Sequence, residues 1–418
     1  MLFRPENVLF FGFVTYLGLW VIAPLQSVVE IAPTSVVFIL ICCCTFVAGS
    51  RFSDLVKVSH RTRFALERTI ARKEARLFWT MFVIGGVGNL IRLIDRYVLR
   101  GVGDLSGGLA REVLLESSTS ALSLVGAVLY PFGFIPILIY LGSRFMPRSR
   151  FKLIAALVLF LIPAFDALII FSRSFMLVAL AMAYFGTSIS VFNGKAIPRK
   201  LLLPVAAGIA AVVFVSANVF LWRLDEMSFS VFDSIYVSGY AHTVIPNAGA
   251  HAILSNGGPA ANMLAVILPI SQYYTHALFE FQILWVQPTP QEFAFGALTF
   301  APYFKALEMF GLAGAADLFA LFPRVGVFTS FFGPLWVDFG WFSPLMMFVF
   351  GMWARSLARS AQKGDIGAYP LYSHFCVVLF FAPVVNFMIS AQGMYSINAF
   401  VIFWIVSRKL YKMKPVAA

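Results

Sequence analysis

The chain has 418 residues, of which 60% are hydrophobic and only 12% are charged. Soluble domains carry about 45–50% apolar and about 25% charged residues. The composition therefore excludes a soluble globular protein, a disordered protein and a nucleic-acid-binding protein built on a basic patch. It predicts a polytopic, all-α integral membrane protein, in which the net charge of +12 is first an indicator of topology.

Ten apolar runs predict transmembrane helices of about 20 residues each, if the shortest run borrows flanking residues. They cover residues 8–25, 34–49, 77–94, 117–142, 153–171, 175–192, 201–221, 333–354, 368–387 and 391–407. No small-residue cleavage site follows the first run, which we therefore interpret as a retained span rather than a signal peptide.

The basic residues fix the expected orientation. One set of loops, with both termini, holds 23 of the 31 Lys and Arg residues and five of the 19 acids, a net charge of +18. The rest of the chain holds 8 basic and 14 acidic residues, a net charge of −6. The positive-inside rule then places both termini in the cytoplasm of a multi-pass inner-membrane protein.

Two outer segments, 95–116 and 222–332, are longer than a turn requires. The second predicts a division into residues 1–221 with seven spans, a large periplasmic loop at 222–332, and residues 333–418 with three spans. Within this loop, 262–272 and 312–322 suit helices that lie at the membrane interface, or a further pair of spans that would raise the total to twelve. Because the chain contains no Asp-x-Asp, no HExxH and no His-x-x-x-His, we expect no metal site.

Charges at span ends on the outer side are the candidates for function. Asp166 lies inside the fifth run, and Arg173 follows seven residues later, on the same helix face and about 10 Å away. Seven of the eight outer basic residues are Arg, which suits bidentate contacts with phosphate. They are Arg92, Arg96, Arg100, Arg111, Arg173, Arg223, Lys305 and Arg324. Arginines that merely mark helix ends remain an alternative, as does snorkelling for Arg173.

The tract from Phe322 to Trp341 contains Arg324, Thr329 and the sequence Gly-Pro-Leu-Trp-Val-Asp-Phe-Gly at 333–340. It resembles the C-terminal signature of the bacterial oligosaccharide repeat-unit polymerases, the O-antigen polymerase (Wzy-type) family. The Ser-Arg pair at 172–173 and the segment from Asp95 to Gly101, which contains Arg100, are similar to that family too.

The resemblance implies a glycosyltransferase C-like, integral-membrane enzyme. It would join undecaprenyl-diphosphate-linked repeat units into a surface polysaccharide or exopolysaccharide at the periplasmic face, without nucleotide sugar, metal or other cofactor. Its partners would be the lipid-linked oligosaccharide donor and acceptor, and the chain-length regulator and flippase of the same pathway.

Such a reaction needs positive charge on the leaving diphosphate and a general base for the acceptor hydroxyl. For the diphosphate we expect Arg173, Arg223 and Arg324, with Arg100 next. The candidate bases are Asp225, Glu226, His242, His251 and Asp338, of which Asp338 could instead anchor the eighth span. Tyr240 before His242 suits a sugar-stacking platform, and Asp95 and Asp166 suit a polar substrate pocket.

Two other functions fit the same architecture. A ligase that transfers O-antigen to the lipid A core also has one large outer loop with Arg and His. A lipid-linked sugar flippase or other transporter would carry charges through several spans, and often repeated halves. Here Asp166 is the clearest mid-span charge, and no repeat is visible. A scaffold without catalytic activity would not explain the outer arginines.

Overall fold

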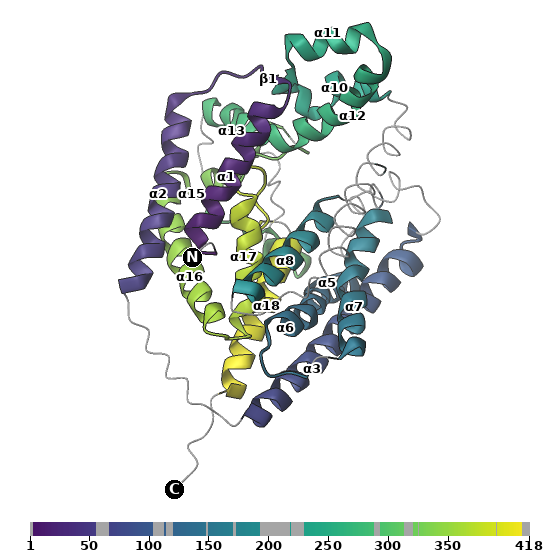
Figure 1. Ribbon diagram of the computed structural model, residues 1–418, viewed down its shortest axis with the longest axis vertical. Coiled ribbons are helices and arrows are strands. Elements are labelled where there is room, and N and C mark those ends of the chain that lie inside the picture. Colours follow the sequence, from purple (N-terminus) through teal and green to yellow (C-terminus); the bar gives the residue numbers. More distant parts are fainter. Residues whose placement is uncertain are drawn as a thin grey trace. The chain divides into compact units, whose positions relative to one another are not determined.

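The computed structural model (Figure 1) is mostly helical, with little sheet. It describes residues 3–55, 67–102, 113, 120–147, 149–169, 173–192, 218, 230–287, 293–312, 321–324, 326–389 and 391–411. Within these ranges, the helices long and apolar enough to cross a membrane are Pro5–Ile22, Pro33–Leu55, Ile70–Leu99, Ala121–Gly142 and Phe332–Gln362. The all-α membrane architecture is thereby confirmed, whereas the total of ten spans stays a prediction. Apart from residue 218, the run 201–221 lies outside the described residues.

Contacts divide the chain into two compact units, and each unit combines segments that are distant in sequence. Unit 1 comprises Met1–Leu55, Leu224–Arg355 and Val378–Met394, and unit 2 comprises Val56–Arg223, Ser356–Val377 and Tyr395–Ala418. Helices α16 (Ser343–Gln362), α17 (Ala368–Phe380) and α18 (Ala391–Tyr411) contribute residues to both units.

Unit 1 begins with the two N-terminal apolar helices and includes the described part of the large loop. Its elements include α1 (Pro5–Ile22), β1 (Leu25–Ser27), α2 (Pro33–Leu55), α10 (Val231–Val237), a 3₁₀ turn (Gly239–His242), β2 (Val244–Pro246), α11 (Ala248–Asn256), α12 (Gly258–Thr275), α13 (Ala277–Val286), α14 (Ala301–Met309) and α15 (Phe332–Phe339). Local sequence sets several helix starts. Pro5 occupies the first turn of α1, and the Ser230 and Asn247 side chains cap α10 and α11.

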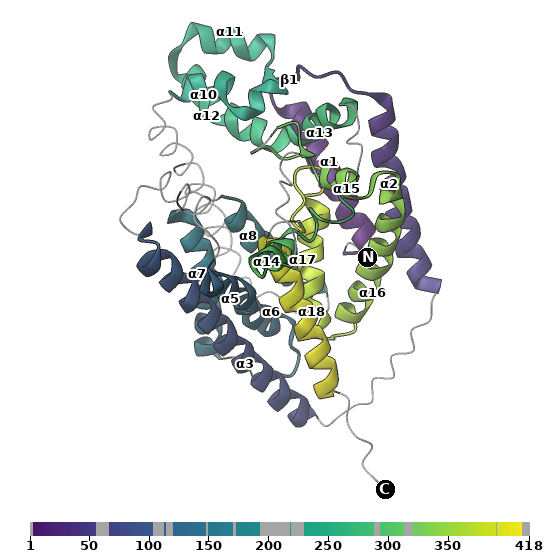
Figure 2. The same ribbon diagram turned by 180° about the vertical axis from the view of Figure 1, so that it is seen from behind.

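The loop packs on the end of α1 through a short antiparallel sheet. Strand β1 pairs with β2 in the register Leu25↔Pro246, and the Tyr16 hydroxyl donates to the Thr275 carbonyl (2.6 Å). A buried apolar cluster at this junction contains Leu25, Ile235, Val244, Ala265, Leu268 and Phe279. Helices α10, α11 and α12 gather beside β1 in both views (Figures 1 and 2). The segment 262–272 therefore belongs to an 18-residue helix inside a folded subdomain.

Two irregular segments of unit 1 pair with each other. The expected helix 368–387 already ends at Phe380, shortly before Pro383, which favours an extended or turn conformation in the residue before it. The chain that follows accepts a hydrogen bond from Phe331 N at the Ala382 carbonyl (2.8 Å), and Ser330 forms a parallel bridge with Val385. Non-helical backbone in a membrane protein requires partners of this kind, because lipid cannot satisfy its polar groups.

Unit 2 is a helical bundle interrupted by proline. Its elements are α3 (Glu67–Leu93), a π-helix (Ile94–Leu99), α5 (Ala121–Leu129), a 3₁₀ segment (Tyr130–Phe134), α6 (Ile135–Gly142), α7 (Arg150–Ile169) and α8 (Arg173–Phe192). The single run predicted at 117–142 divides into three pieces because Pro131 and Pro136 lack the amide hydrogen that a continuous helix uses.

The backbone of α3 approaches the 3₁₀ segment closely at Gly85. A Cβ atom at Gly85 would overlap the backbone of Gly133, whereas a Cβ atom at the adjacent Gly86 would meet nothing within 4 Å. Small residues permit this close helix packing in membranes.

We expect Gly85→Ala to lower stability by about 2 kcal/mol, because backbone must move to admit the methyl group. The matched variant Gly86→Ala should be neutral or slightly stabilising, since alanine favours helix and the site is open. Thermal unfolding of the two purified variants in the same detergent measures the difference. Equal unfolding temperatures would contradict the close contact.

Candidate functional site

A polar cluster in the described part of unit 1 surrounds Arg324. Arg324 Nη1 donates to Glu280 Oε1 (2.5 Å), and its Nη2 donates to the Gly239 carbonyl. The Thr243 hydroxyl donates to the same Glu280 oxygen (3.3 Å). The tract that resembles the polymerase signature is thus joined to α13 and to the turn before β2. We call Arg324, Glu280, Thr243, Tyr240 and His276 the Arg324 cluster.

Burial sets the charge properties of Glu280. Its side chain is 1% exposed, whereas that of Arg324 is 22% exposed and so covers the carboxylate while reaching the surface. Burial raises the pKa of Glu280, although Arg324 and Thr243 oppose this shift. Helix α13 has ten residues, too few to span a bilayer, which requires about 20. A sheltered carboxyl with a raised pKa beside a guanidinium is suited to acid–base chemistry.

His276 is the aromatic centre of the cluster. Its ring lies 4.4 Å from the Tyr240 ring and 5.9 Å from the Phe328 ring. Nδ1 lies 3.0 Å from the Gln272 carbonyl, and Nε2 accepts the Phe328 amide hydrogen (3.2 Å). These backbone partners assign the proton to Nδ1, and burial lowers the pKa of His276 to about 4. The imidazole is therefore neutral with both nitrogens engaged, which makes it a positioning residue for Tyr240 and the tract.

The lowered pKa of His276 predicts a stability loss in acid. Above pH 6.5, the ordinary pKa of histidine, the His276 side chain is neutral in both the folded and the unfolded protein. As the pH falls from 6.5 to about 4, this side chain binds a proton in the unfolded protein only. We expect unfolding to become easier by about 3 kcal/mol across this window. The raised pKa of Glu280 acts in the opposite direction, so the measured quantity is the difference between wild type and His276→Gln. The control is His251→Gln, since His251 is exposed. Parallel pH curves for wild type and His276→Gln would contradict this assignment.

Asp338 is fully engaged as an anchor. Its carboxylate in α15 accepts hydrogen bonds from Leu298 N (2.9 Å), Thr299 N (2.8 Å) and Thr299 Oγ1 (2.6 Å). This arrangement fixes the turn before α14 on α15. It favours the anchoring role over that of a base. Gly340, with φ +49, then ends α15 in a conformation that favours glycine.

The other predicted residues of the large loop differ in position. Tyr240 lies in the Arg324 cluster, half-buried against His276, while His242 at the end of the same 3₁₀ turn is exposed. His251 is exposed and contacts Ser255. Arg223, Asp225 and Glu226 lie outside the described residues.

In unit 2 the structure gives Asp166 partners from another helix. Arg92 Nε (3.1 Å) and Arg96 Nη1 (2.6 Å) both donate to Asp166 Oδ2. Arg100 forms an ion pair with Asp95 (3.0 Å). Arg173 begins α8, and its side chain lies outside the described residues, as does Arg111.

Glu280 and Thr243 were not among the site residues that the sequence predicted. A signal for Glu280 was present, since it is a single acid in an apolar stretch, the same feature that singled out Asp166. Thr243 carries no such signal, because a threonine beside a turn is common in any loop.

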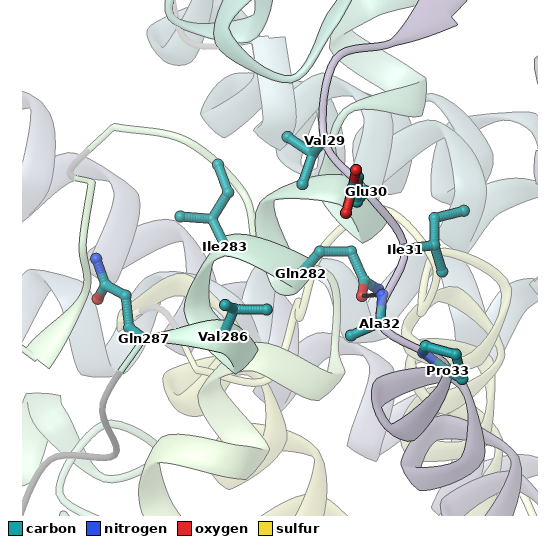
Figure 3. A pocket seen from close by; sticks show the side chains of 9 residues that line it. All are labelled: Val29, Glu30, Ile31, Ala32, Pro33, Gln282, Ile283, Val286 and Gln287. Carbon is teal, nitrogen blue, oxygen red and sulfur yellow. Dashed lines mark hydrogen bonds between the residues drawn. The ribbon is translucent and has the colours of Figure 1, made fainter.

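A separate pocket of about 640 Å³ lies between the β1–α2 connection and α13 (Figure 3). Its lining residues are Val29, Glu30, Ile31, Ala32, Pro33, Gln282, Ile283, Val286 and Gln287. The Gln282 side-chain oxygen already accepts from Ala32 N (3.1 Å) and Ser35 Oγ (2.5 Å). None of these lining residues is basic, so they offer no charge for a phosphate.

Comparisons with known proteins leave the site to be interpreted from its residues alone. No protein-family model, no curated protein and no solved structure matches this chain.

Proposed function

We propose that the protein is a polymerase of lipid-diphosphate-linked oligosaccharide repeat units, acting at the periplasmic face of a bacterial inner membrane with both termini in the cytoplasm. The observation that carries the proposal is the Arg324–Glu280 pair. It brings the tract that resembles the polymerase signature against a buried carboxyl group, beside the aromatic side chain of Tyr240.

The proposed reaction exchanges one glycosidic bond for another. A hydroxyl oxygen of the acceptor sugar attacks the anomeric carbon of the donor chain, and the bond from that carbon to the diphosphate oxygen breaks. The lipid diphosphate leaves with the electron pair, and the hydroxyl proton passes to a carboxylate. Charge therefore develops on the diphosphate, where a guanidinium stabilises it.

In the proposed reaction, two adjacent groups of the cluster carry out these two tasks. The Arg324 side chain is partly exposed and would bind the diphosphate, and Glu280 would receive the proton of the acceptor hydroxyl. When the diphosphate binds the Arg324 guanidinium, Glu280 loses the partner that lowers its pKa. The pKa of Glu280 then rises further, and its carboxylate becomes a stronger base. Diphosphate binding and base activation are thereby coupled through one ion pair.

The test is a deletion strain complemented with the wild-type chain. We expect deletion to leave single repeat units on the final acceptor, and complementation to restore the ladder of chain lengths. Loss of all repeat units from the acceptor would indicate a ligase, and lipid-linked units trapped in the cytoplasmic leaflet would indicate a flippase; either result contradicts the proposal.

Purified protein provides the biochemical counterpart. With an undecaprenyl-diphosphate-linked repeat unit as the only substrate, we expect chain elongation that persists in EDTA. Elongation that requires an added nucleotide sugar would contradict the lipid-diphosphate donor.

A further inference from the structure

A second charged cluster lies in unit 2, where α3 continues into the π-helix. Arg92 and Arg96, four residues apart, both donate to one oxygen of Asp166 on α7 (3.1 and 2.6 Å). The Tyr97 hydroxyl lies 3.3 Å from the other oxygen. The Arg92 guanidinium lies 4.4 Å from the centre of the Tyr130 ring, which fixes its orientation. π-Helical turns are frequent at functional sites.

The charges of this cluster do not balance. Arg100 pairs with Asp95 (3.0 Å), and among the residues that the structure describes Asp166 is the one carboxylate that pairs with Arg92 and Arg96. Within the described part of the chain, the two arginines therefore carry one positive charge more than Asp166 balances, and their side chains are only 17% and 16% exposed. Sheltered charges are costly unless they are paired, which makes an anion the complementary ligand.

Stability alone does not require two arginines on one carboxylate. Unit 1 contains a bidentate ion pair, in which Arg355 Nε and Nη2 donate to the two carboxylate oxygens of Asp54, both at 2.9 Å. There one guanidinium satisfies one carboxylate as a fork. In unit 2, by contrast, Arg96 donates from Nη1 alone within the described part of the chain. Its Nε and second amino group remain as donors for a ligand.

The geometry points to a binding site for a phosphate-class anion, formed by Arg92 and Arg96 on Asp166. In this site Arg92 is held in place by its contacts, and the Arg96 guanidinium binds the ligand. Val98 and Leu99, the next apolar residues of the π-helix, are exposed. Exposed apolar side chains beside sheltered guanidinium groups fit the boundary between lipid tails and phosphate headgroups. This site does not depend on the proposed polymerase activity.

Binding to the purified full-length protein tests the site. The probes are inorganic pyrophosphate in detergent solution and phosphatidic acid in nanodiscs, with phosphatidylcholine nanodiscs as the reference. We expect Arg96→Gln to weaken the binding of phosphatidic acid at least tenfold. The control Arg408→Gln removes an equal charge from α18 and should leave binding unchanged.

The two probes distinguish the source of the anion. A loss confined to phosphatidic acid identifies a lipid headgroup, and an equal loss for pyrophosphate identifies a site for free phosphates as well. Wild-type affinity of Arg96→Gln for both probes overturns the proposal.

Thermal unfolding separates binding from folding. Arg92 still neutralises Asp166 in Arg96→Gln, so the unfolding temperature should stay within a few degrees of wild type, whereas Asp166→Asn should lower it strongly. Arg96→Lys keeps the charge without the fork and should bind with intermediate affinity. If Arg96→Gln and Asp166→Asn are equally destabilised, Arg96 is a counter-ion for folding and the proposal is wrong.

Discussion

Replacing Arg324 by Gln should reduce polymer formation at least a hundredfold and should also destabilise the protein. The first effect follows from loss of the cation proposed to hold the diphosphate. The second follows from the carboxylate that remains: Glu280 is almost fully buried, and stranding one partner of a buried pair costs about 3–5 kcal/mol. A loss of polymer in this variant alone would therefore not distinguish chemistry from folding.

The double variant Arg324→Gln with Glu280→Gln makes that distinction. Two neutral amides replace the ion pair, so we expect the unfolding temperature to return close to that of wild type while polymer formation stays abolished. Arg324→Lys preserves the charge without the bidentate fork and should retain partial activity. Polymer ladders of normal length from the stable double variant would refute both the diphosphate role of Arg324 and the base role of Glu280.

Replacing Asp338 by Ala should produce the second large effect, and this effect should be structural. Removing the Asp338 carboxylate leaves the buried amide of Leu298 and the half-buried amide and hydroxyl of Thr299 without their acceptor. An unsatisfied buried group costs about 1–3 kcal/mol and the half-buried groups cost less, so we expect a total loss of about 3 kcal/mol. Thermal unfolding in detergent measures it.

Thr299→Val is the matched control for Asp338. It removes one of the three hydrogen bonds and should cost about 1 kcal/mol. Asp338→Asn keeps one acceptor oxygen and should be intermediate. If Asp338→Asn instead unfolds like wild type and forms no polymer, Asp338 is the catalytic base and the anchoring role is wrong.

Each of the five described helices that are long and apolar enough to cross a membrane overlaps one of the predicted apolar runs. Their interruptions were harder to predict, because Pro131 and Pro136 divide one apolar run into separate helical segments whose mean hydropathy remains high. The irregular backbone after Phe380 depends on pairing with the tract near Ser330, about 50 residues away, and no local pattern encodes that pairing.

The partners of site residues were also beyond local patterns. Helical periodicity predicts that Asp166 and Arg173 share a helix face, and this stays a prediction. It could not predict that Arg92, Arg96 and Tyr97 contact Asp166 from another part of the chain. Periodicity identifies which residues of one helix share a face, and only packing decides which helices meet. Glu280 was overlooked for a related reason, since its partner Arg324 lies 44 residues further along the chain.

The β1–β2 pairing has a consequence for biosynthesis. The ribosome makes residues 25–27 more than 200 residues before their partners at 244–246. The first apolar helix must therefore hold an unpaired strand at its end until the large loop has been delivered to the same side of the membrane. A loop fragment that starts after residue 55 lacks both this strand and the Tyr16 hydroxyl that donates to the Thr275 carbonyl, so excising the loop exposes the edge of β2.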